Sequence, residues 1–396
     1  MSTPVPSALS PRVAGLRPTA VNTILAEVRR VRATGRTVVS LMRGEPDLPT
    51  PAHITRAAID ALGRGRTGYP DNRGELACRE AVAQKLARDN GLAYDPGTEV
   101  LLTSGATFGI HAALTAVLRE GDEVLLPDPV YDAYQSPVRL AGGRVRPVRA
   151  TLEGSRFTLT AEALHAAVTP RTRVLLLNTP WNPVGTVLRE EELRAVADVV
   201  IRHDLVLVSD EIYEALVYDG FRHVSPAALD PELRARTILV NSLSKTYAMP
   251  GWRVGYCAAP AAFIDPMFLV LQQSSRGPAT FVQDAAVAAL VGPQAPVAEM
   301  LAVYAGRRAQ VAEALAGLPG VRVLSPEGGF FAMVDVRELG RSSDEVRRQL
   351  LEEAGVVVVH GAAYGAGGEG TLRVSFASGG DALADGLVRL RQGLAG

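Results

Sequence analysis

The feature that most restricts the fold of this chain is a series of short apolar runs separated by helical patterns. Runs rich in valine and leucine that alternate with amphipathic helices predict a parallel α/β sheet. Their hydrophobicity is continuous, which indicates that helices cover both faces of the sheet. The candidate strands are EVLLTSG, DEVLLPDP, RVLLLNTP, LVLVSDE, TILVNSLSK and WRVGYCA, and helical stretches such as FGIHAALTAVLRE and EEELRAVADVVIRHD lie between them.

Nearly every candidate strand ends in polar side chains. Parallel strands point their carboxyl ends toward one edge of a sheet, and open α/β sheets bind ligands beyond that edge. We therefore expect these polar clusters to meet in a single site. They are Thr103-Ser104-Gly105, Asp128-Pro129, the segment 178–182, Ser209-Asp210-Glu211 and the segment 242–245.

A second unit is expected to begin near Gly292, where the pattern changes. PVAEMLAVYAGRRAQVAEALAGLPG predicts a long helix that ends at Pro-Gly. The short strands and helices that follow have the pattern of an α+β unit with a small sheet. The first 47 residues are expected to pack with it. The predicted division is a large domain, residues 48–291, and a small domain made of residues 1–47 and 292–396.

Composition narrows the class of protein. The formal net charge of the 396 residues is -1, which gives no general attraction to nucleic acid or to an anionic membrane. No apolar run is long enough to span a bilayer, and the N-terminus lacks the apolar core of a secretory signal. Cys78 and Cys257 are isolated, as in a reduced, cytoplasmic protein. The six histidines lack metal-binding spacing, so no metal is expected.

Lys245 stands out because the chain has only two lysines among its 41 lysine and arginine residues. A lysine amine, unlike an arginine guanidinium, can lose its proton and attack a carbonyl carbon. Lys245 follows an apolar run and lies among hydroxyl side chains, which favours a chemical role. The other lysine, Lys85, lies in a charged helical pattern, where we expect it on a solvated face.

The polar clusters supply three kinds of chemical group. The segment 104–107 begins a helix, whose free backbone N–H groups and positive dipole end favour a phosphate. Ser242, Ser244 and Arg253 add hydroxyl groups and a guanidinium that suit phosphate oxygens. Asp210 follows an apolar strand, which predicts partial burial and a need for a cationic partner. A phosphate cradle, such a carboxylate and a Schiff-base lysine together meet the needs of pyridoxal 5'-phosphate.

Eight short motifs in register resemble those of the class I/II aminotransferases of fold type I, the aspartate aminotransferase superfamily. The resemblance implies a large domain with a mostly parallel seven-stranded sheet between helices, and a smaller α+β domain. It also implies a homodimer that moves an amino group from an L-amino acid to a 2-oxo acid in a ping-pong cycle. The motifs are GEPDLPTP, GYPDNRGELACREA, TSGATFGI, PDPVYDAY, NTPWNPVGT, SDEIYEAL, SLSKTYAMPGWRVGY and LRVSFA.

The same resemblance implies roles for single residues. Lys245 would form the internal aldimine with the cofactor and then move a proton as general base and acid. Asp210 would pair with the pyridinium nitrogen, and Asn182 and Tyr213 would hydrogen-bond the phenolate oxygen. Arg373 would bind the substrate α-carboxylate together with Asn182. The other implied contacts are Gly44 with the substrate, Tyr131 stacked on the cofactor ring, Gly105, Ala106, Ser242, Ser244 and Arg253 on the phosphate, and Tyr69 reaching that phosphate from the neighbouring subunit.

Two alternatives stay open on the sequence alone. A C–S β-lyase, or another eliminating enzyme of this fold, would share every cofactor residue. A sensing module of a transcription regulator would bind the cofactor without turnover. The substrate side chain is also open, because the residues that depart from the family pattern do not define a pocket. They are Arg43, Trp181, Arg276 and His360.

Overall fold

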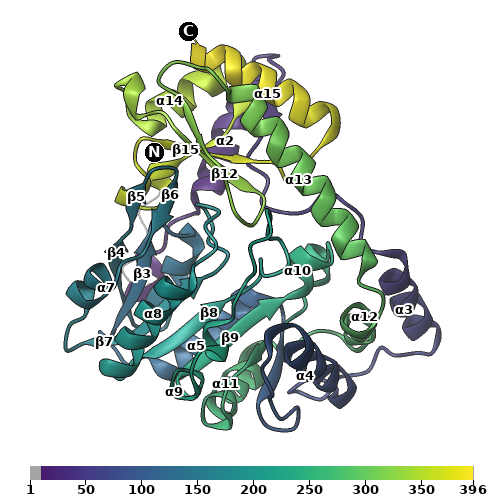
Figure 1. Cartoon of the computed structure of the whole chain (residues 1–396). Coiled ribbons are helices and arrows are strands. Elements are labelled where there is room, and N and C mark those ends of the chain that lie inside the picture. The colour runs from purple at the N-terminus through teal and green to yellow at the C-terminus, as the bar shows by residue number, and fades with distance from the viewer. Residues whose placement is uncertain (1–9, 396) are drawn as a thin grey trace.

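The computed structural model describes residues 10–395, and a seven-stranded sheet forms its centre (Figure 1). The strand order is β2-β10-β9-β8-β7-β3-β4. Neighbouring strands are parallel except where β10 pairs with β2 and β9 in antiparallel fashion. The predicted α/β class is confirmed, and so is the mostly parallel seven-stranded sheet. The strands are β2 (Val100–Thr103), β3 (Glu123–Asp128), β4 (Arg144–Arg149), β7 (Thr172–Asn178), β8 (Val206–Asp210), β9 (Thr237–Ser242) and β10 (Gly255–Ala258).

Helices cover both faces of this sheet, because successive strand side chains point to opposite sides. In β7, Val174 and Leu176 pack with α5 and α11, whereas Leu175 and Leu177 pack with α8 on the other face. A third cluster joins the β2 end of the sheet to α4 and α12. The helices of this part are α3 (Ala52–Gly63), α4 (Leu76–Asn90), α5 (Ala106–Val117), α6 (Gln135–Leu140), α7 (Ala161–Ala167), α8 (Glu190–Arg202), α9 (Pro231–Arg234), α10 (Leu243–Thr246), α11 (Ala261–Ser274) and α12 (Thr280–Val291).

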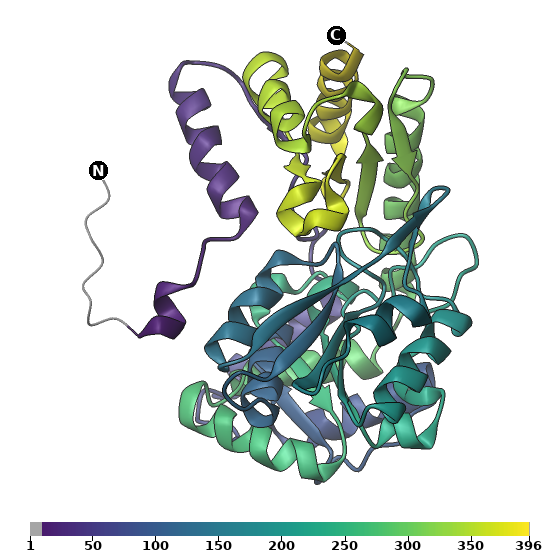
Figure 2. The ribbon, with the colours of Figure 1, turned by 90° about the vertical axis from the view of Figure 1, so that its left-hand side faces the viewer.

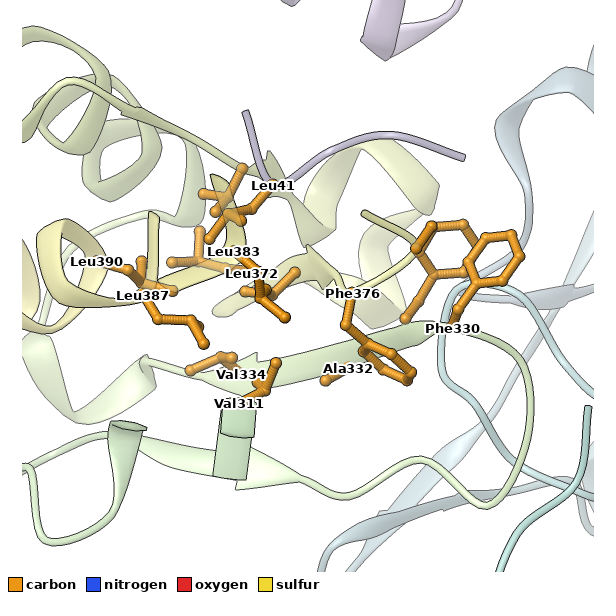
Figure 3. Close-up of a cluster of buried hydrophobic side chains, with 14 of the residues drawn as sticks. Leu41, Val311, Phe330, Ala332, Val334, Leu372, Phe376, Leu383, Leu387 and Leu390 are labelled. Carbon is orange, nitrogen blue, oxygen red and sulfur yellow. The ribbon is translucent and has the colours of Figure 1, made fainter. Parts of the chain in front are cut away.

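A second, antiparallel sheet has the order β11-β12-β15-β14. Figure 3 shows its core, in which Val334 and Leu372 of the strands meet Leu387 of α15 and Val311 of α13. The long helix predicted after Gly292 is α13. The elements are α13 (Ala295–Leu315), β11 (Arg322–Leu324), β12 (Phe331–Asp335), α14 (Ser343–Gln349), β13 (Val356–Val357), β14 (Val359–His360), β15 (Thr371–Ser375) and α15 (Gly380–Ala395).

The N-terminal segment lies against this second sheet. In Figure 2, α1 (Pro11–Ala14) and α2 (Ala20–Ala33) form an arm at one side of the molecule. Ile24 and Val28 of α2 pack against Val357 and Val359, and β1 (Val39–Ser40) pairs with β13 in parallel. The predicted domain boundaries at residues 48 and 291 stay predictions. Within residues 10–395 no single helix is long and apolar enough to cross a membrane, although the bent pair α12–α13 meets that criterion when taken together.

Lys85 is buried, so the prediction that it lies on a solvated face is wrong. Its amine forms an ion pair with Glu214 and donates a 2.8 Å hydrogen bond to Asn90 Oδ1. Glu214 also accepts hydrogen bonds from the amides of Asn90, at 2.8 Å, and Asn241, at 2.7 Å. The register explains the error, because Cys78, Val82 and Lys85 follow one another at the helical spacing of a buried stripe.

Replacing Lys85 by methionine is expected to lower the free energy of unfolding by about 3–5 kcal/mol, because Glu214 keeps its charge in a buried site without its cation. Urea unfolding of the two proteins measures the difference. In the control, Glu214→Gln is added to the methionine variant and recovers part of the loss, since the remaining buried amide is neutral. A loss below about 1 kcal/mol, typical of an exposed pair, contradicts this account.

Candidate active site

A cavity of about 970 Å³ lies at the carboxyl edge of the seven-stranded sheet. Residues that follow the ends of β2, β3, β7, β8 and β9 line it, so the structure brings the polar strand ends together. Gly44 and Arg373 line it from outside this sheet. The predicted site residues in the lining are Gly44, Ala106, Tyr131, Asn182, Asp210, Tyr213, Ser242, Ser244, Lys245, Arg253 and Arg373.

Arg253 reaches this edge because β10 runs against its neighbours. The start of β10 lies where the other strands end, with Gly255 opposite both Ser242 and Thr103. The Arg253 backbone has a φ of 55°, a left-handed value that non-glycine residues seldom adopt. Its guanidinium donates to the carbonyl oxygens of Pro250, at 3.0 Å, and Ser104, at 3.4 Å. These contacts hold the charge beside the start of α5.

Gly105 is outside the lining but shapes it as the residue before α5. Its φ of 87° favours glycine, and a Cβ there would lie 2.7 Å from Arg253 Nη2. Gly255 lets α5 approach the sheet, since a Cβ there would lie 2.9 Å from the backbone nitrogen of Ala106. The first N–H groups of α5 therefore lie at the cavity wall beside the Arg253 guanidinium.

Two hydroxyl groups complete this corner of the cavity. Ser242 and Ser244 both line it, and the Ser242 hydroxyl caps α10 by accepting a 3.4 Å hydrogen bond from the Ser244 N–H. Helix N–H groups, hydroxyls and a guanidinium are donors that suit a phosphate. We call the set Ala106, Thr107, Ser242, Ser244 and Arg253 the anion corner.

Lys245 lies in α10, directly after β9, and its amine donates a 2.6 Å hydrogen bond to the carbonyl oxygen of Gly44. Burial lowers its pKa to about 8, since desolvation outweighs the opposing attraction of Glu45 and Asp210. A lysine with this pKa keeps a sizeable neutral fraction near pH 7, which an exposed lysine does not. The neutral amine is the form that attacks a carbonyl carbon or accepts a proton.

Asp210 is buried at the end of β8. Burial raises its pKa to about 6, although hydrogen bonds from the Tyr134 hydroxyl, at 2.6 Å, and the Ile212 N–H, at 3.2 Å, oppose the shift. Within residues 10–395 Asp210 forms no ion pair. The sequence predicted a cationic partner for this carboxylate; within the described residues, the Lys245 amine attracts it without forming an ion pair.

Asp210→Asn is expected to stabilise the ligand-free chain at alkaline pH. The folded-state pKa of about 6 lies above the usual aspartate value of about 3.9, so the folded chain binds this proton more tightly than the unfolded chain. Wild type therefore loses stability as the pH rises from about 4 through 6. We expect the variant to be about 3 kcal/mol more stable near pH 8 and nearly equal near pH 4 in urea unfolding. If the variant is more stable than wild type by the same amount at pH 4 and pH 8, the loss of the Asp210 proton does not cause the difference in stability.

Arg373, in β15, is buried between two aromatic rings. Its guanidinium carbon lies 4.0 Å from the ring centroid of Phe331 and 4.9 Å from that of Tyr364. Its nitrogens donate 3.3 Å hydrogen bonds to Asn182 Oδ1 and to the Met42 carbonyl oxygen, and Nε has no partner. Arg373 forms no ion pair with any described carboxylate. A buried guanidinium with donors to spare is suited to a carboxylate ligand.

Asn182, Tyr213 and Tyr131 reach the cavity in different ways. The N–H of Asn182 donates a 2.8 Å hydrogen bond to Asn178 Oδ1, which fixes the loop after β7. Tyr213 is buried, and its ring centroid lies 5.5 Å from that of Phe330, with the two rings nearly perpendicular. Tyr131 is half-exposed at the cavity wall. The cofactor and substrate roles of these residues stay predictions.

Two residues of the site were not assigned from the sequence. Tyr134 hydrogen-bonds Asp210, and its signal was the YDAY motif, which places it one helical turn after Tyr131. Asn178 ends β7 directly opposite Asp210 in β8, and its amide donates a 2.9 Å hydrogen bond to the Asp210 carbonyl oxygen. The alignment of neighbouring strand ends could have indicated it.

Four other noted residues do not line the cavity: Tyr69, Trp181, Arg276 and His360. Tyr69 is 89% exposed and outside it, with the Arg276 guanidinium 5.6 Å from its ring centroid. Trp181 is buried and donates a 2.9 Å hydrogen bond to the Pro129 carbonyl oxygen, so its role is packing. His360 does not line the cavity.

Comparison with known proteins agrees with this geometry. Residues 36–389 match the family model described as aminotransferase class I and II. The chain is 40% identical over 389 residues to an aspartate aminotransferase of Geobacillus stearothermophilus, which covers 97% of this chain and 98% of the relative. It is 41% identical over 360 residues to aromatic-amino-acid aminotransferase 2 of Thermococcus litoralis, with 90% and 91% covered.

The fold matches as well as the sequence. The crystal structure of an aspartate aminotransferase from Rhizobium meliloti superimposes with a TM-score of 0.94 at 35% identity, and the match covers 98% of both chains. The family model spans both sheets and every lining residue from Val38 to Ala382. The chain belongs to the class I and II aminotransferases, a family of fold type I enzymes.

Proposed function

We propose that this aminotransferase uses pyridoxal 5'-phosphate and transfers the amino group of an L-amino acid to a 2-oxo acid in a ping-pong cycle. One observation carries the proposal: Lys245, whose amine can lose its proton near neutral pH, shares a cavity with Arg373, a buried guanidinium that has no anionic partner in the described part of the chain. The amine suits covalent attachment of a carbonyl compound. The guanidinium suits the carboxylate that every amino acid and 2-oxo acid carries.

The residues of the cavity fit the cofactor at three separate points. The anion corner suits its phosphate. Buried Asp210 lacks a cation within the described chain, and a protonated ring nitrogen would provide one. Lys245 Nζ supplies the amine for the aldehyde carbon. Tyr131 would contact the ring face, while Asn182 and Tyr213 would hydrogen-bond its phenolate oxygen. When bound, the cofactor supplies an electron-withdrawing ring that acidifies the Cα proton of an attached amino acid.

The chain's own groups then orient the substrate and move the proton. Arg373 and Asn182 hold the α-carboxylate, and the Gly44 backbone lies beside it. Neutral Lys245 Nζ takes the proton from the substrate Cα and later returns one, which a pKa of about 8 permits near neutrality. Tyr134 holds Asp210 in place through its 2.6 Å hydrogen bond. The first substrate leaves as a 2-oxo acid before the second 2-oxo acid binds, so one site serves both half-reactions.

Two further proposals concern assembly and location. We infer a homodimer in which Tyr69 reaches the neighbouring phosphate, supported by its 89% exposure and its place outside the cavity of its own chain. We infer a cytoplasmic location, supported by Cys78 and Cys257, which are both free thiols in the core.

A half-reaction titration tests the proposed function. Amino acids are added to the purified protein loaded with pyridoxal 5'-phosphate, without any 2-oxo acid, and the cofactor absorbance is followed. Transamination yields one equivalent of pyridoxamine phosphate and one of the 2-oxo acid. Accumulating ammonia with an unchanged cofactor spectrum identifies an eliminating enzyme instead. No reaction with any of the amino acids contradicts catalysis.

A further inference from the structure

We propose that His165 and His203, which we call the histidine pair, form a surface binding site for a divalent transition metal ion such as Zn²⁺. His165 lies in α7, and His203 is the first residue after α8. Neither residue lines the active-site cavity, so the proposal does not depend on the proposed function. The spacing of the histidines along the chain predicted no metal, because the two residues are 38 positions apart and only the packing of α7 on α8 brings them together.

The first observation is the separation of two ring nitrogens. His165 Nδ1 lies 3.0 Å from His203 Nε2, and within residues 10–395 neither nitrogen hydrogen-bonds any other group. Two nitrogens bound to one tetrahedral zinc ion, each at about 2.0–2.1 Å, lie about 3.3 Å apart. The two nitrogens are therefore nearly as far apart as two ligands of one ion. The side chain of His203 is exposed, so its ring can turn to point its lone pair at that ion.

The second observation is a carboxylate that fixes the proton positions of His165. Asp198 Oδ2 lies 2.9 Å from His165 Nε2, and because a carboxylate only accepts hydrogen bonds, Nε2 carries a proton. Nδ1 of neutral His165 is then an unprotonated nitrogen that accepts the proton of His203 Nε2. A bound ion would replace that proton, which moves to His203 Nδ1 through solvent. Carboxylates orient metal-binding imidazoles in this way in many proteins.

The backbone beneath the histidine pair is held by the core. Leu164 of α7 packs with Val196 and Val200 of α8, and all three side chains are fully buried. The two rings therefore start from fixed positions, so little further ordering opposes the binding of an ion. His203 also lines a surface hollow of about 460 Å³, which leaves room for water molecules as the remaining ligands.

The charges near the histidine pair favour one class of metal. Asp198 is paired through Oδ1 with Arg202 at 2.8 Å, and Arg173 and Asp204 line the hollow beside His203, so charges of both signs are present. Ca²⁺ and Mg²⁺ need several oxygen ligands, which these groups do not offer together. Zn²⁺, Ni²⁺ and Cu²⁺ bind the lone pairs of imidazole nitrogens and do not require an acidic surface.

Equilibrium dialysis of the cofactor-loaded, full-length protein against micromolar ZnCl₂ at neutral pH tests the proposal. We expect each chain to bind one Zn²⁺ tightly. Asp198→Ala should raise the dissociation constant about 10-fold, and His165→Gln and His203→Gln, which each remove a ligand, should raise it by at least about 10-fold. If wild type binds no zinc, or if the glutamine variants bind it as tightly as wild type, the proposal is overturned.

His360→Gln is the matched control for these variants. His360 also lies near a carboxylate, 3.6 Å from Asp344 Oδ1, but among residues 10–395 it hydrogen-bonds no other histidine. Its replacement should leave the affinity for zinc unchanged. A loss in His360→Gln as large as that in His203→Gln contradicts a site made by the histidine pair.

Urea unfolding gives a readout that a purely structural role of His203 would not change. An ion that binds the folded chain stabilises it, so ZnCl₂ should raise the urea midpoint of wild type and leave that of His203→Gln unchanged. The shift in wild type should shrink as the pH is lowered, because protons compete with the ion for the ring nitrogens. An equal shift in both proteins means that zinc binds elsewhere and overturns the proposal.

Discussion

Lys245→Ala is expected to lower kcat for transamination by about 10⁴-fold or more. The variant loses the amine that attaches the cofactor and the base that moves the Cα proton, and positioned general bases alone contribute about 10²–10⁴-fold. Stopped-flow absorbance with a single amino acid measures the loss in one half-reaction. The dependence on pH is a second readout, because wild-type attachment of pyridoxal 5'-phosphate should accelerate as the pH rises through about 8, where Lys245 becomes neutral.

The small number of lysines in the sequence allows a direct control for this experiment. Borohydride reduction fixes a carbonyl compound to the lysine that holds it, and Lys85 is the only other lysine side chain. Lys85 is buried in an ion pair with Glu214, away from the cavity lining. Peptide mass spectrometry should therefore find the label on Lys245 in wild type and no label on Lys85, the one lysine that remains, in the alanine variant. Cofactor fixed to Lys85, or unchanged turnover in the variant, means that Lys245 is not the reactive amine.

Arg373→Met is expected to lower kcat/KM for every amino acid donor by about 10³-fold. The variant loses two charge-assisted hydrogen bonds to the α-carboxylate, each worth about 1.5–3 kcal/mol. The loss should be common to all donors because the α-carboxylate is common to them. Steady-state kinetics with a short and a long donor check this uniformity.

In Arg373→Met, the free energy of unfolding should not fall together with the activity. Arg373 is buried and has no anionic partner among residues 10–395, and methionine fills a similar space without a charge. We therefore expect Arg373→Met to unfold at the same or a higher urea concentration than the ligand-free wild type. Arg373→Lys, which keeps the charge but not the planar fork, should give an intermediate kcat/KM. A donor-dependent loss in Arg373→Met, or a fall in stability that parallels activity, contradicts carboxylate binding by Arg373.

Six of the seven strands of the main sheet could be predicted because their apolar runs are continuous. β4 was missed, and its position explains why. It pairs only with β3 at the sheet edge, where Arg144 and Arg149 are exposed and Pro147 is tolerated. The exposed arginines and proline of β4 interrupt its apolar run, so its pattern resembles that of a loop, whereas β2 at the opposite edge is fully buried and keeps an apolar run.

The candidate site could be predicted where polar residues directly follow strands. It was predicted less well where tertiary packing determines which side chains come together. Asp210 and Lys245 follow apolar runs in the sequence. Tyr134 becomes important only because the chain after β3 folds back over the end of β8, which no local pattern reveals. The charge of Lys85 led to the prediction that it is exposed, although its helical register places it on the buried side of α4. Register was therefore a better guide to burial than residue type at that position.

The reversed direction of β10 has a consequence for engineering. Lys245 and Arg253 lie only eight positions apart, joined by the turn between β9 and β10. The reactive amine and the guanidinium of the anion corner are thus carried by one short, paired stretch of chain, and neither can shift along the sheet without the other. A chimera between family members should exchange residues 237–258 as a single block. A crossover inside that block would take Lys245 from one parent and Arg253 from the other, and the relative positions of the two side chains would then not be matched.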